Sequence, residues 1–285
     1  MFKAILMIST CLMSSAYASK WPVDLRSYTP LSGKIWDTRA RHFITPDQFI
    51  ESTLDHDWLF IGENHENTTH HLIETALINH FSSINQLGNV AFEMANSSQQ
   101  SLIDAHMGKA IEPEDIGWLP GWPWEWYEGP VTQAIKKAKR VLGVDLTREQ
   151  QMTVYRDQPL ALPEGSLREY MDNLLFESHC GMLPKEQLSN MLQVQIARDQ
   201  AMAEIINTNA SDQVDIYIAG SIHTRIDTGV PLYSNVDQVT LLLVAAGPST
   251  DPSKYFPQSY RDQPVADYLL FTPEITPRDH CADFK

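Results

Sequence analysis

Short hydrophobic runs alternate with longer amphipathic stretches along this chain. Five of the runs are too short for a helix, and several are rich in Val and Ile, so they predict buried β-strands. These runs are residues 58–61, 90–94, 141–146, 214–219 and 239–246. Because the segments between them have helical patterns, we expect parallel strands joined by helices.

Three of the intervening segments predict helices. Thr-Pro-Asp-Gln at 45–48 provides an N-cap, a proline at the first helical position and a capping-box glutamine. A second helix is expected over 70–81 and a long third helix over 185–207. The apolar stripe of the third comprises Leu188, Met191, Leu192, Ile196, Met202 and Ile206. The predicted fold class is therefore α/β, with a mostly parallel sheet flanked by helices on both faces.

One segment, residues 111–130, departs from this alternation because it is dense in Pro, Gly and Trp. We expect it to be an ordered, Trp-rich insertion that caps the sheet rather than a boundary between domains. With no repeat and no low-complexity linker, residues 19–285 are predicted to form a single α/β domain.

The first 18 residues have the order of features found in secretory signal peptides. Lys3 precedes an apolar run, 4–13, and Ala16-Tyr17-Ala18 places small residues where a signal peptidase reads the chain. We therefore expect residues 1–18 to be removed and the protein to be exported, either to the periplasm or out of the cell. No other stretch approaches the ~20 apolar residues of a membrane span, so no transmembrane segment is expected, while peripheral membrane association stays open.

Removal of the signal peptide takes Cys11 with it and leaves two cysteines, Cys180 and Cys281. In an exported chain they predict one disulfide, with two buried thiols as the alternative. The formal net charge is −15, with 21 Lys and Arg against 36 Asp and Glu, and the basic stretch at 136–140 is only five residues long. Because binding to polyanions draws on clustered cations, nucleic acid is excluded as an expected partner.

Polar residues recur where the predicted strands end. Glu63 and His65 follow the first strand, Glu93 and Asp145 end the next two, and His223 follows the fourth. Ligands of parallel α/β sheets bind beyond the carboxyl ends of the strands, so these side chains predict one polar cluster.

Polar residues also interrupt the apolar stripe of the long helix. Gln195 and Asp199 lie on or near its buried face and are expected to brace the loop histidines, since buried polar groups need partners. Arg198 is expected to pair with a strand-end carboxylate.

Several separated motifs resemble one protein family. They are GENHxxxxHH after the first strand, FEM after the next, WEWYEGP in the Trp-rich segment, QxxxARDQAMA on the long helix and AGSIHTRxxxGVP after a late strand. In this order, across residues 42–231, they resemble the ChaN-type haem-binding domain of the superfamily that includes Tiki proteases, TraB-like proteins and erythromycin esterases. The resemblance implies an exported bacterial haem-binding protein of haem or iron acquisition, with a tyrosine ligand, histidine support, a possible homodimer and an outer-membrane haem uptake system as partner.

The Trp-rich segment supplies aromatic residues that suit a haem slot. Residues 117–127 contain four of the seven tryptophans beside Tyr127, our candidate ligand for ferric iron. Ligation requires a phenol of pKa ~10 to lose its proton, and His70 or His71 is the candidate acceptor. The alternative, that the tryptophans pack the insertion onto the sheet with Tyr127 in the core, stays open.

Other residues complete the predicted haem site. His65, Trp124 and Trp126 are expected to contact the haem. Arg225 is the candidate to neutralise a carboxylate of the ligand, such as a propionate, with a solvated arginine as the alternative. The alternative tyrosine ligands are Tyr155, Tyr170, Tyr217 and Tyr233.

A hydrolase is the competing interpretation. Glu63, His65, Glu93 and His223 are residue types that hold a divalent metal ion and activate bound water. H-E-x-x-H and G-x-S-x-G motifs are both absent, so a metal-dependent esterase or protease would need a site assembled from several strands. Whether the protein is an enzyme stays open, with haem binding preferred.

Overall fold

A central β-sheet organises the protein. The computed structural model describes residues 29–157, 160–276 and 281–282, and within them eight strands form one sheet in the order β2-β1-β8-β7-β3-β6-β4-β5. The strands are β1 (Ile35–Asp37), β2 (His42–Ile44), β3 (Trp58–Glu63), β4 (Leu87–Asn96), β5 (Val141–Asp145), β6 (Val214–Gly220), β7 (Gln238–Ala246) and β8 (Tyr268–Pro273). Neighbours from β8 to β5 pair in parallel, while β1 pairs antiparallel with both β8 and β2.

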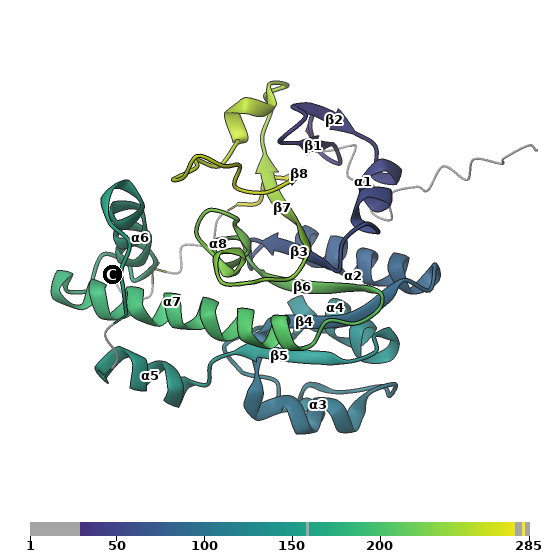
Figure 1. Cartoon of the computed structure of the whole chain (residues 1–285), viewed down its shortest axis with the longest axis horizontal. Helices are drawn as coiled ribbons and strands as arrows, with labels where there is room; N and C mark the ends of the chain where they lie inside the picture. Colours follow the sequence, from purple (N-terminus) through teal and green to yellow (C-terminus); the bar gives the residue numbers. More distant parts are fainter. Residues whose placement is uncertain (1–28, 158–159, 277–280, 283–285) are drawn as a thin grey trace, which may run out of the picture.

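Helices cover both faces of this sheet (Figure 1). They are α1 (Pro46–Thr53), α2 (Thr68–Ser83), α3 (Gln100–His106), α4 (Trp124–Lys137), α5 (Arg148–Asp157), α6 (Gly165–Ser178), α7 (Lys185–Thr208) and α8 (Ser221–Thr224). Short 3-10 turns are η1 (Ser97–Gln99), η2 (Pro113–Ile116), η3 (Val230–Leu232) and η4 (Pro252–Tyr255). Helices α5 and α6 pack beside α7 (Figure 1).

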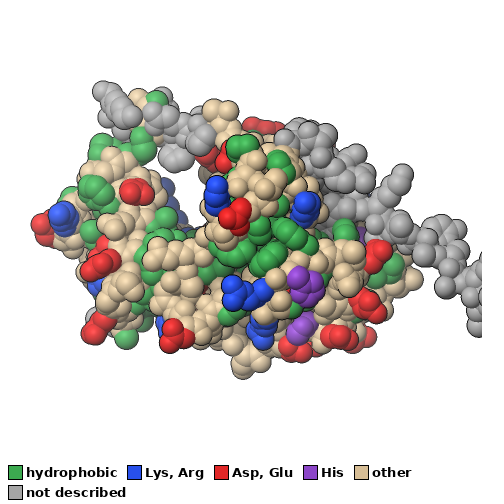
Figure 2. All heavy atoms as spheres, turned by 90° about the horizontal axis from the view of Figure 1, so that it is seen from above, with side chains coloured by type: hydrophobic (Ala, Val, Ile, Leu, Met, Phe, Trp, Pro, Cys, Tyr) green, Lys and Arg blue, Asp and Glu red, His purple; other side chains and the backbone are tan. Residues whose placement is uncertain are grey.

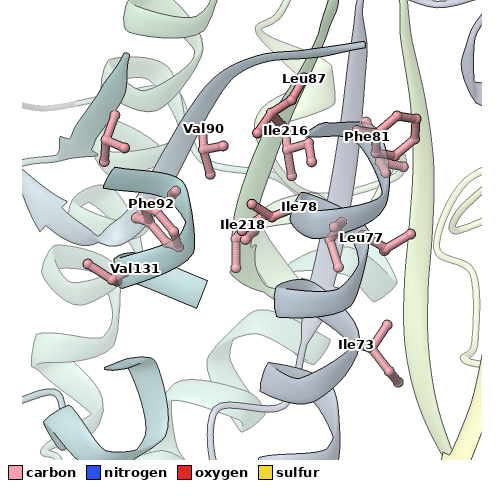
Figure 3. Packing of buried hydrophobic residues seen from close by; sticks show 14 of the residues in the cluster. Ile73, Leu77, Ile78, Phe81, Leu87, Val90, Phe92, Val131, Ile216 and Ile218 are labelled. Carbon is pink, nitrogen blue, oxygen red and sulfur yellow. The ribbon is translucent and has the colours of Figure 1, made fainter. Parts of the chain in front are cut away.

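Successive residues of a strand point to opposite faces, which divides the core into two layers. Leu59 and Ile61 of β3 pack with α2 and α4, whereas Trp58 and Phe60 pack with Met202 and Ile206 of α7. Figure 3 shows the first layer, in which the hydrophobic side of α2 lies against strands β4 and β6. The central strands are buried on both faces, which explains their continuous hydrophobic runs.

The predicted α/β fold is confirmed. All five predicted strands are present, and the helices expected over 70–81 and 185–207 correspond to α2 and α7. The capping box is formed: the Thr45 hydroxyl accepts a hydrogen bond from the backbone N–H of Gln48, and the Gln48 side chain accepts one from the backbone N–H of Thr45. Strands β1, β2 and β8 and helices α3, α4, α5, α6 and α8 were not predicted.

The expected disulfide joins Cys180, just beyond α6, to Cys281. In the described part of the chain, no helix combines the length and apolarity that a membrane crossing requires. The face seen in Figure 2 has hydrophobic side chains across its middle and acidic side chains spread around the edges. The predicted signal peptide, residues 1–18, lies outside the described residues.

Candidate ligand site at the carboxyl edge of the sheet

Arg198 of α7 holds the predicted strand-end residues together. Its guanidinium donates to Glu93 Oε1 at 2.7 Å and to both carboxylate oxygens of Asp145 at 2.8 and 2.9 Å. Nη1 also donates to Gln195 Oε1 and to Nε2 of His223, each at 3.1 Å. Because the guanidinium can only donate, this Nε2 is an acceptor and the ring proton is on Nδ1.

Asp199, one residue further along α7, fixes the other side of His223. The Asp199 carboxylate accepts a hydrogen bond from Nδ1 of the imidazole at 2.7 Å. The expected bracing of the loop histidine by the long helix is therefore present, and the expected pairing of Arg198 with strand-end carboxylates is present twice over.

Glu93 lies at the centre of the cluster and is 2% exposed. Its Oε2 accepts a hydrogen bond from the backbone N–H of Gly220 at 2.7 Å. Burial opposes ionisation of this carboxyl, but His223, His65 and Arg198 outweigh it and lower the pKa of Glu93 to about 2. Glu93 is thus a fixed negative charge at neutral pH.

Glu63, at the end of β3, joins His65 to Tyr127. The Tyr127 hydroxyl and Nδ1 of His65 each donate to Glu63 Oε1 at 2.9 Å. Burial alone would raise the pKa of the Glu63 carboxyl, but His65 and His71 hold it well below its usual range. Burial alone would lower the pKa of His65, but Glu63 and then Glu93 raise it to about 9.

These groups form the polar floor of a cavity of about 760 Å³. Floor residues are His65, Glu93, Asp145, Arg198, Asp199 and His223. The apolar walls include Leu119, Trp122, Leu146, Met171, Leu174, Leu175 and Ile222. A cavity of this size, mostly apolar with a few convergent polar groups, has the properties of small-molecule and cofactor sites.

Tyr127 does not line this cavity. It is 0% exposed and its ring packs against Trp118, Trp122 and His71. Burial, followed by Glu63 and Glu74, raises the pKa of the Tyr127 phenol well above its usual value. Tyr127 therefore lies in the core of the haem-free protein, and ligation of iron by this residue stays a prediction.

His70 and His71 are likewise buried. Nδ1 of His70 accepts from the backbone N–H of Asn64 at 2.9 Å, and Nε2 lies 2.9 Å from the Thr272 hydroxyl. Burial lowers the pKa of His70 to about 3, so its ring is neutral and serves to hold the loop after β3 against β8. His71 faces Glu63 from α2 rather than the cavity.

Arg225 also differs from its predicted role. Its guanidinium donates to both oxygens of Asp227 at 2.9 and 2.7 Å and lies over the rings of Tyr170 and Tyr260. Because that charge is already paired away from the cavity, Arg225 is not positioned for a propionate. Arg148, an exposed residue of α5 on the cavity wall, was not predicted.

The Trp-rich insertion packs on the core as an aromatic cap. Trp124 and Trp126 pack against the cluster that contains Tyr127, while Trp122 reaches the cavity and lies 4.8 Å from the His65 ring, measured between centroids. Of the predicted haem-contact residues, His65 alone is placed on the cavity surface; its side chain is 30% exposed.

The geometry opposes the predicted metal-dependent hydrolase. An ion held by Glu93 and His223 would need the carboxylate oxygen and ring nitrogen that Arg198 already contacts. The positive guanidinium would also repel the ion. Around the single guanidinium of Arg198, the floor keeps three carboxylates, those of Glu93, Asp145 and Asp199.

Comparison with known proteins identifies the family. A profile described as haem-binding uptake, Tiki superfamily, ChaN matches residues 49–233. The chain belongs to the ChaN family. The ChaN protein of Campylobacter jejuni, whose solved structure is described as showing cofacial haem binding, is 25% identical and has a TM-score of 0.69. The match covers 85% of this chain and 97% of the Campylobacter protein.

More distant solved structures include a Bacillus cereus protein and an erythromycin esterase variant in its open conformation. The Bacillus protein is 10% identical, with a TM-score of 0.42 over 70% of this chain and 68% of its own. The esterase is 12% identical, with a TM-score of 0.44 over 82% of this chain and 80% of its own. Neither likeness bears on function. A search among curated proteins finds no significant match.

Proposed function

We propose that this ChaN-family protein is exported and binds ferric haem at the carboxyl edge of the sheet as a step in haem uptake. Family membership and the likeness to a protein described as binding haem cofacially support haem as the ligand. The observation that carries the proposal is the 760 Å³ cavity, which sets apolar walls above an imidazole anchored from behind. Haem needs the same combination of an apolar slot and an axial ligand.

His65 is the proposed axial ligand on this subunit. Its Nδ1 is held by Glu63 Oε1 at 2.9 Å, and its Nε2 lies 3.7 Å from Glu93 Oε2, beyond hydrogen-bond distance. A histidine that ligates a metal usually donates its other N–H to a carboxylate, which fixes the ring orientation and raises its basicity. Tyr127 then supports the ligand through Glu63, which reverses the predicted roles of tyrosine and histidine.

The surroundings of the cavity suit the rest of the haem. Trp122, Met171 and Leu175 provide apolar contact for the macrocycle, and Arg148 at the rim offers a cation for a propionate. The negative floor also favours ferric haem, whose iron carries a net positive charge after the porphyrin is counted. When bound, the haem supplies an iron centre that this chain would hold and shield.

Two further parts of the proposal concern partners. We propose a homodimer that brings two haem groups together, as the description of the Campylobacter protein suggests, and an outer-membrane haem uptake system as the source of haem. Sedimentation of residues 19–285 with and without haem tests the dimer. A monomer in both conditions would remove it while leaving haem binding intact.

Haem titration tests ligand and binding together. Residues 19–285 are mixed with ferric haem, and absorbance and resonance Raman spectra are recorded for wild type, His65→Ala, Tyr127→Phe and the surface control His106→Ala. We expect saturable histidine-ligated haem in wild type and His106→Ala, lost in His65→Ala and retained in Tyr127→Phe. A tyrosinate spectrum abolished by Tyr127→Phe would restore the predicted tyrosine ligand, and no saturable binding would refute the proposed function.

A further inference from the structure

A second group of ionisable side chains lies behind the cavity, between β3 and α2. It consists of Glu63, His71 and Glu74, which are 1%, 4% and 0% exposed. One potential ligand atom from each lies within 4.8 Å of the others. None of the three lines the cavity, although Glu63 also holds His65 of its floor through its other carboxylate oxygen.

The polar atoms of this group lack the partners that buried atoms normally have. Glu63 Oε2, both oxygens of Glu74 and both ring nitrogens of His71 are buried and make no hydrogen bond. Nε2 of His71 approaches Glu63 Oε2 at 2.8 Å, an ion-pair distance, but without hydrogen-bond alignment. Buried polar atoms are almost always paired, and an unpaired buried carboxylate is costly. One atom from each of the three side chains lies within 4.8 Å of the others, and these buried, incompletely paired groups indicate that something binds between them.

We propose that Glu63, His71 and Glu74 bind a divalent transition-metal ion such as Zn²⁺. One imidazole and two carboxylates form a ligand set for first-row transition metals, whereas Mg²⁺ and Ca²⁺ prefer oxygen ligands throughout. A divalent ion would also offset the charge of the two glutamates, which otherwise remain buried with a single histidine.

The spacing brackets that of a formed site. Zn²⁺ binds histidine nitrogen and carboxylate oxygen at about 2.0–2.2 Å, so two ligand atoms of a tetrahedral site stand ~3.4 Å apart. Nε2 of His71 and Oε2 of Glu63 are 2.8 Å apart, and the three ligand atoms all lie within 4.8 Å of one another. Side-chain rotations of about an ångström would bring them to the tetrahedral spacing.

Neighbouring residues prepare Glu63 for this role. Tyr127 and His65 both donate to its Oε1, which leaves Oε2 directed at His71. Outer hydrogen bonds of this kind orient metal-ligating carboxylates. Because the site is closed, the ion would enter during folding and would join the end of β3 to α2.

The alternative to a metal ion is a proton shared between the carboxyl groups of Glu63 and Glu74, which would remove one of the two negative charges. Burial, and then the charge of Glu63, raise the pKa of Glu74, so without an ion this carboxyl is protonated. The shared proton and the metal ion predict different behaviour of the variant Glu74→Gln. Glu74→Gln imitates the protonated acid and would preserve stability under proton sharing, whereas it removes a ligand from the metal site.

Metal analysis of haem-free protein tests the proposal. Residues 19–285 are refolded with Zn²⁺ or Co²⁺, desalted and analysed for metal content, and the Co²⁺ form is examined for ligand-field absorption in the visible range. We expect one ion per chain in wild type and in the surface control Glu128→Gln, and none in Glu74→Gln. Binding should also raise the melting temperature of wild type by about 5 °C, with no effect on Glu74→Gln.

Two results would overturn the metal site. Wild type that retains no ion, with a melting temperature indifferent to Zn²⁺ and Co²⁺, would leave the shared proton as the explanation. An ion retained by Glu74→Gln but lost from His223→Ala would belong to the cavity floor. Neither result depends on haem, so the haem proposal stands or fails separately.

Discussion

Replacing Arg198 by methionine tests what holds the polar floor together. The Arg198 side chain is 12% exposed, and its guanidinium pairs with Glu93 and with both oxygens of Asp145. Methionine keeps much of the length and apolar volume of the side chain while removing the charge and every donor. The variant therefore leaves two carboxylates, 2% and 12% exposed, without the guanidinium that bridges them.

The expected loss is large because the pairs are shielded from water. Breaking a buried ion pair by removing one partner costs about 3–5 kcal/mol, a substantial part of the 5–15 kcal/mol that stabilises a typical protein. At about 2–4 °C per kcal/mol for a chain of this size, the melting temperature should fall by roughly 6–20 °C. Arg140→Met is the matched control, because Arg140 and Asp104 form an exposed pair at 3.3 Å. Such pairs contribute about 0–1 kcal/mol.

Urea unfolding followed by circular dichroism, at several pH values, measures both effects. The pKa of Glu93 is depressed to about 2 in the folded protein, so its stabilisation is present above the usual carboxyl pKa near 4.5 and is lost as pH falls toward 2. The gap between wild type and Arg198→Met should therefore be widest near pH 7 and narrow below about pH 4.5. If Arg198→Met costs no more than Arg140→Met at pH 7, the guanidinium does not hold this edge of the sheet.

Three further outcomes follow from the same contacts. Since His65 has a pKa of about 9 and must lose its proton to bind iron, haem affinity measured by absorbance should rise about tenfold per pH unit from pH 6 to 8, and a flat profile would contradict ligation by this residue. Replacing both Cys180 and Cys281 by alanine removes a disulfide that closes a loop of 101 residues, and the free energy of unfolding should fall by about 2–5 kcal/mol. An unchanged midpoint of urea unfolding would contradict this. Gly62→Ala puts a methyl group against the Thr224 hydroxyl and should lower the free energy of unfolding by about 1–3 kcal/mol. At Gly121 the added methyl group meets nothing within 4 Å, so Gly121→Ala should leave stability nearly unchanged, and equal effects of the two variants would count against the packing argument.

The interior of the fold was predictable because central parallel strands are buried on both faces. Their runs of apolar residues, as in β3 and β6, are unambiguous signals, and α7 is long enough to show its stripe. Strands β1 and β2, at one end of the sheet, have 3 residues each and carry no such signal. The pairing of β1 depends on contact with β8, more than 200 residues away in the chain, which no local pattern contains.

The sequence predicted which residues belong to the polar cluster, but not how they contact one another. Parallel topology places strand ends at one edge, so Glu93, Asp145 and His223 could be grouped from their positions alone. Arg198 was expected to brace one carboxylate, whereas it bridges two and also contacts the histidine. That difference matters for the hydrolase alternative, because a guanidinium in the centre of the cluster opposes the divalent cation that the same residues would otherwise attract.

The environment of the Tyr127 hydroxyl could not be predicted from the sequence. An aromatic segment around a tyrosine has the same composition whether the ring lines a haem slot or fills the core, since both environments select large apolar side chains. What separates them is the partner of the hydroxyl, and that partner, Glu63, is 64 residues away in the chain. A carboxylate at hydrogen-bond distance turns the phenol into a donor and raises the pKa that ligation would need to overcome. The same carboxylate oxygen accepts a hydrogen bond from His65, so one glutamate joins the buried phenol to the imidazole at the cavity surface.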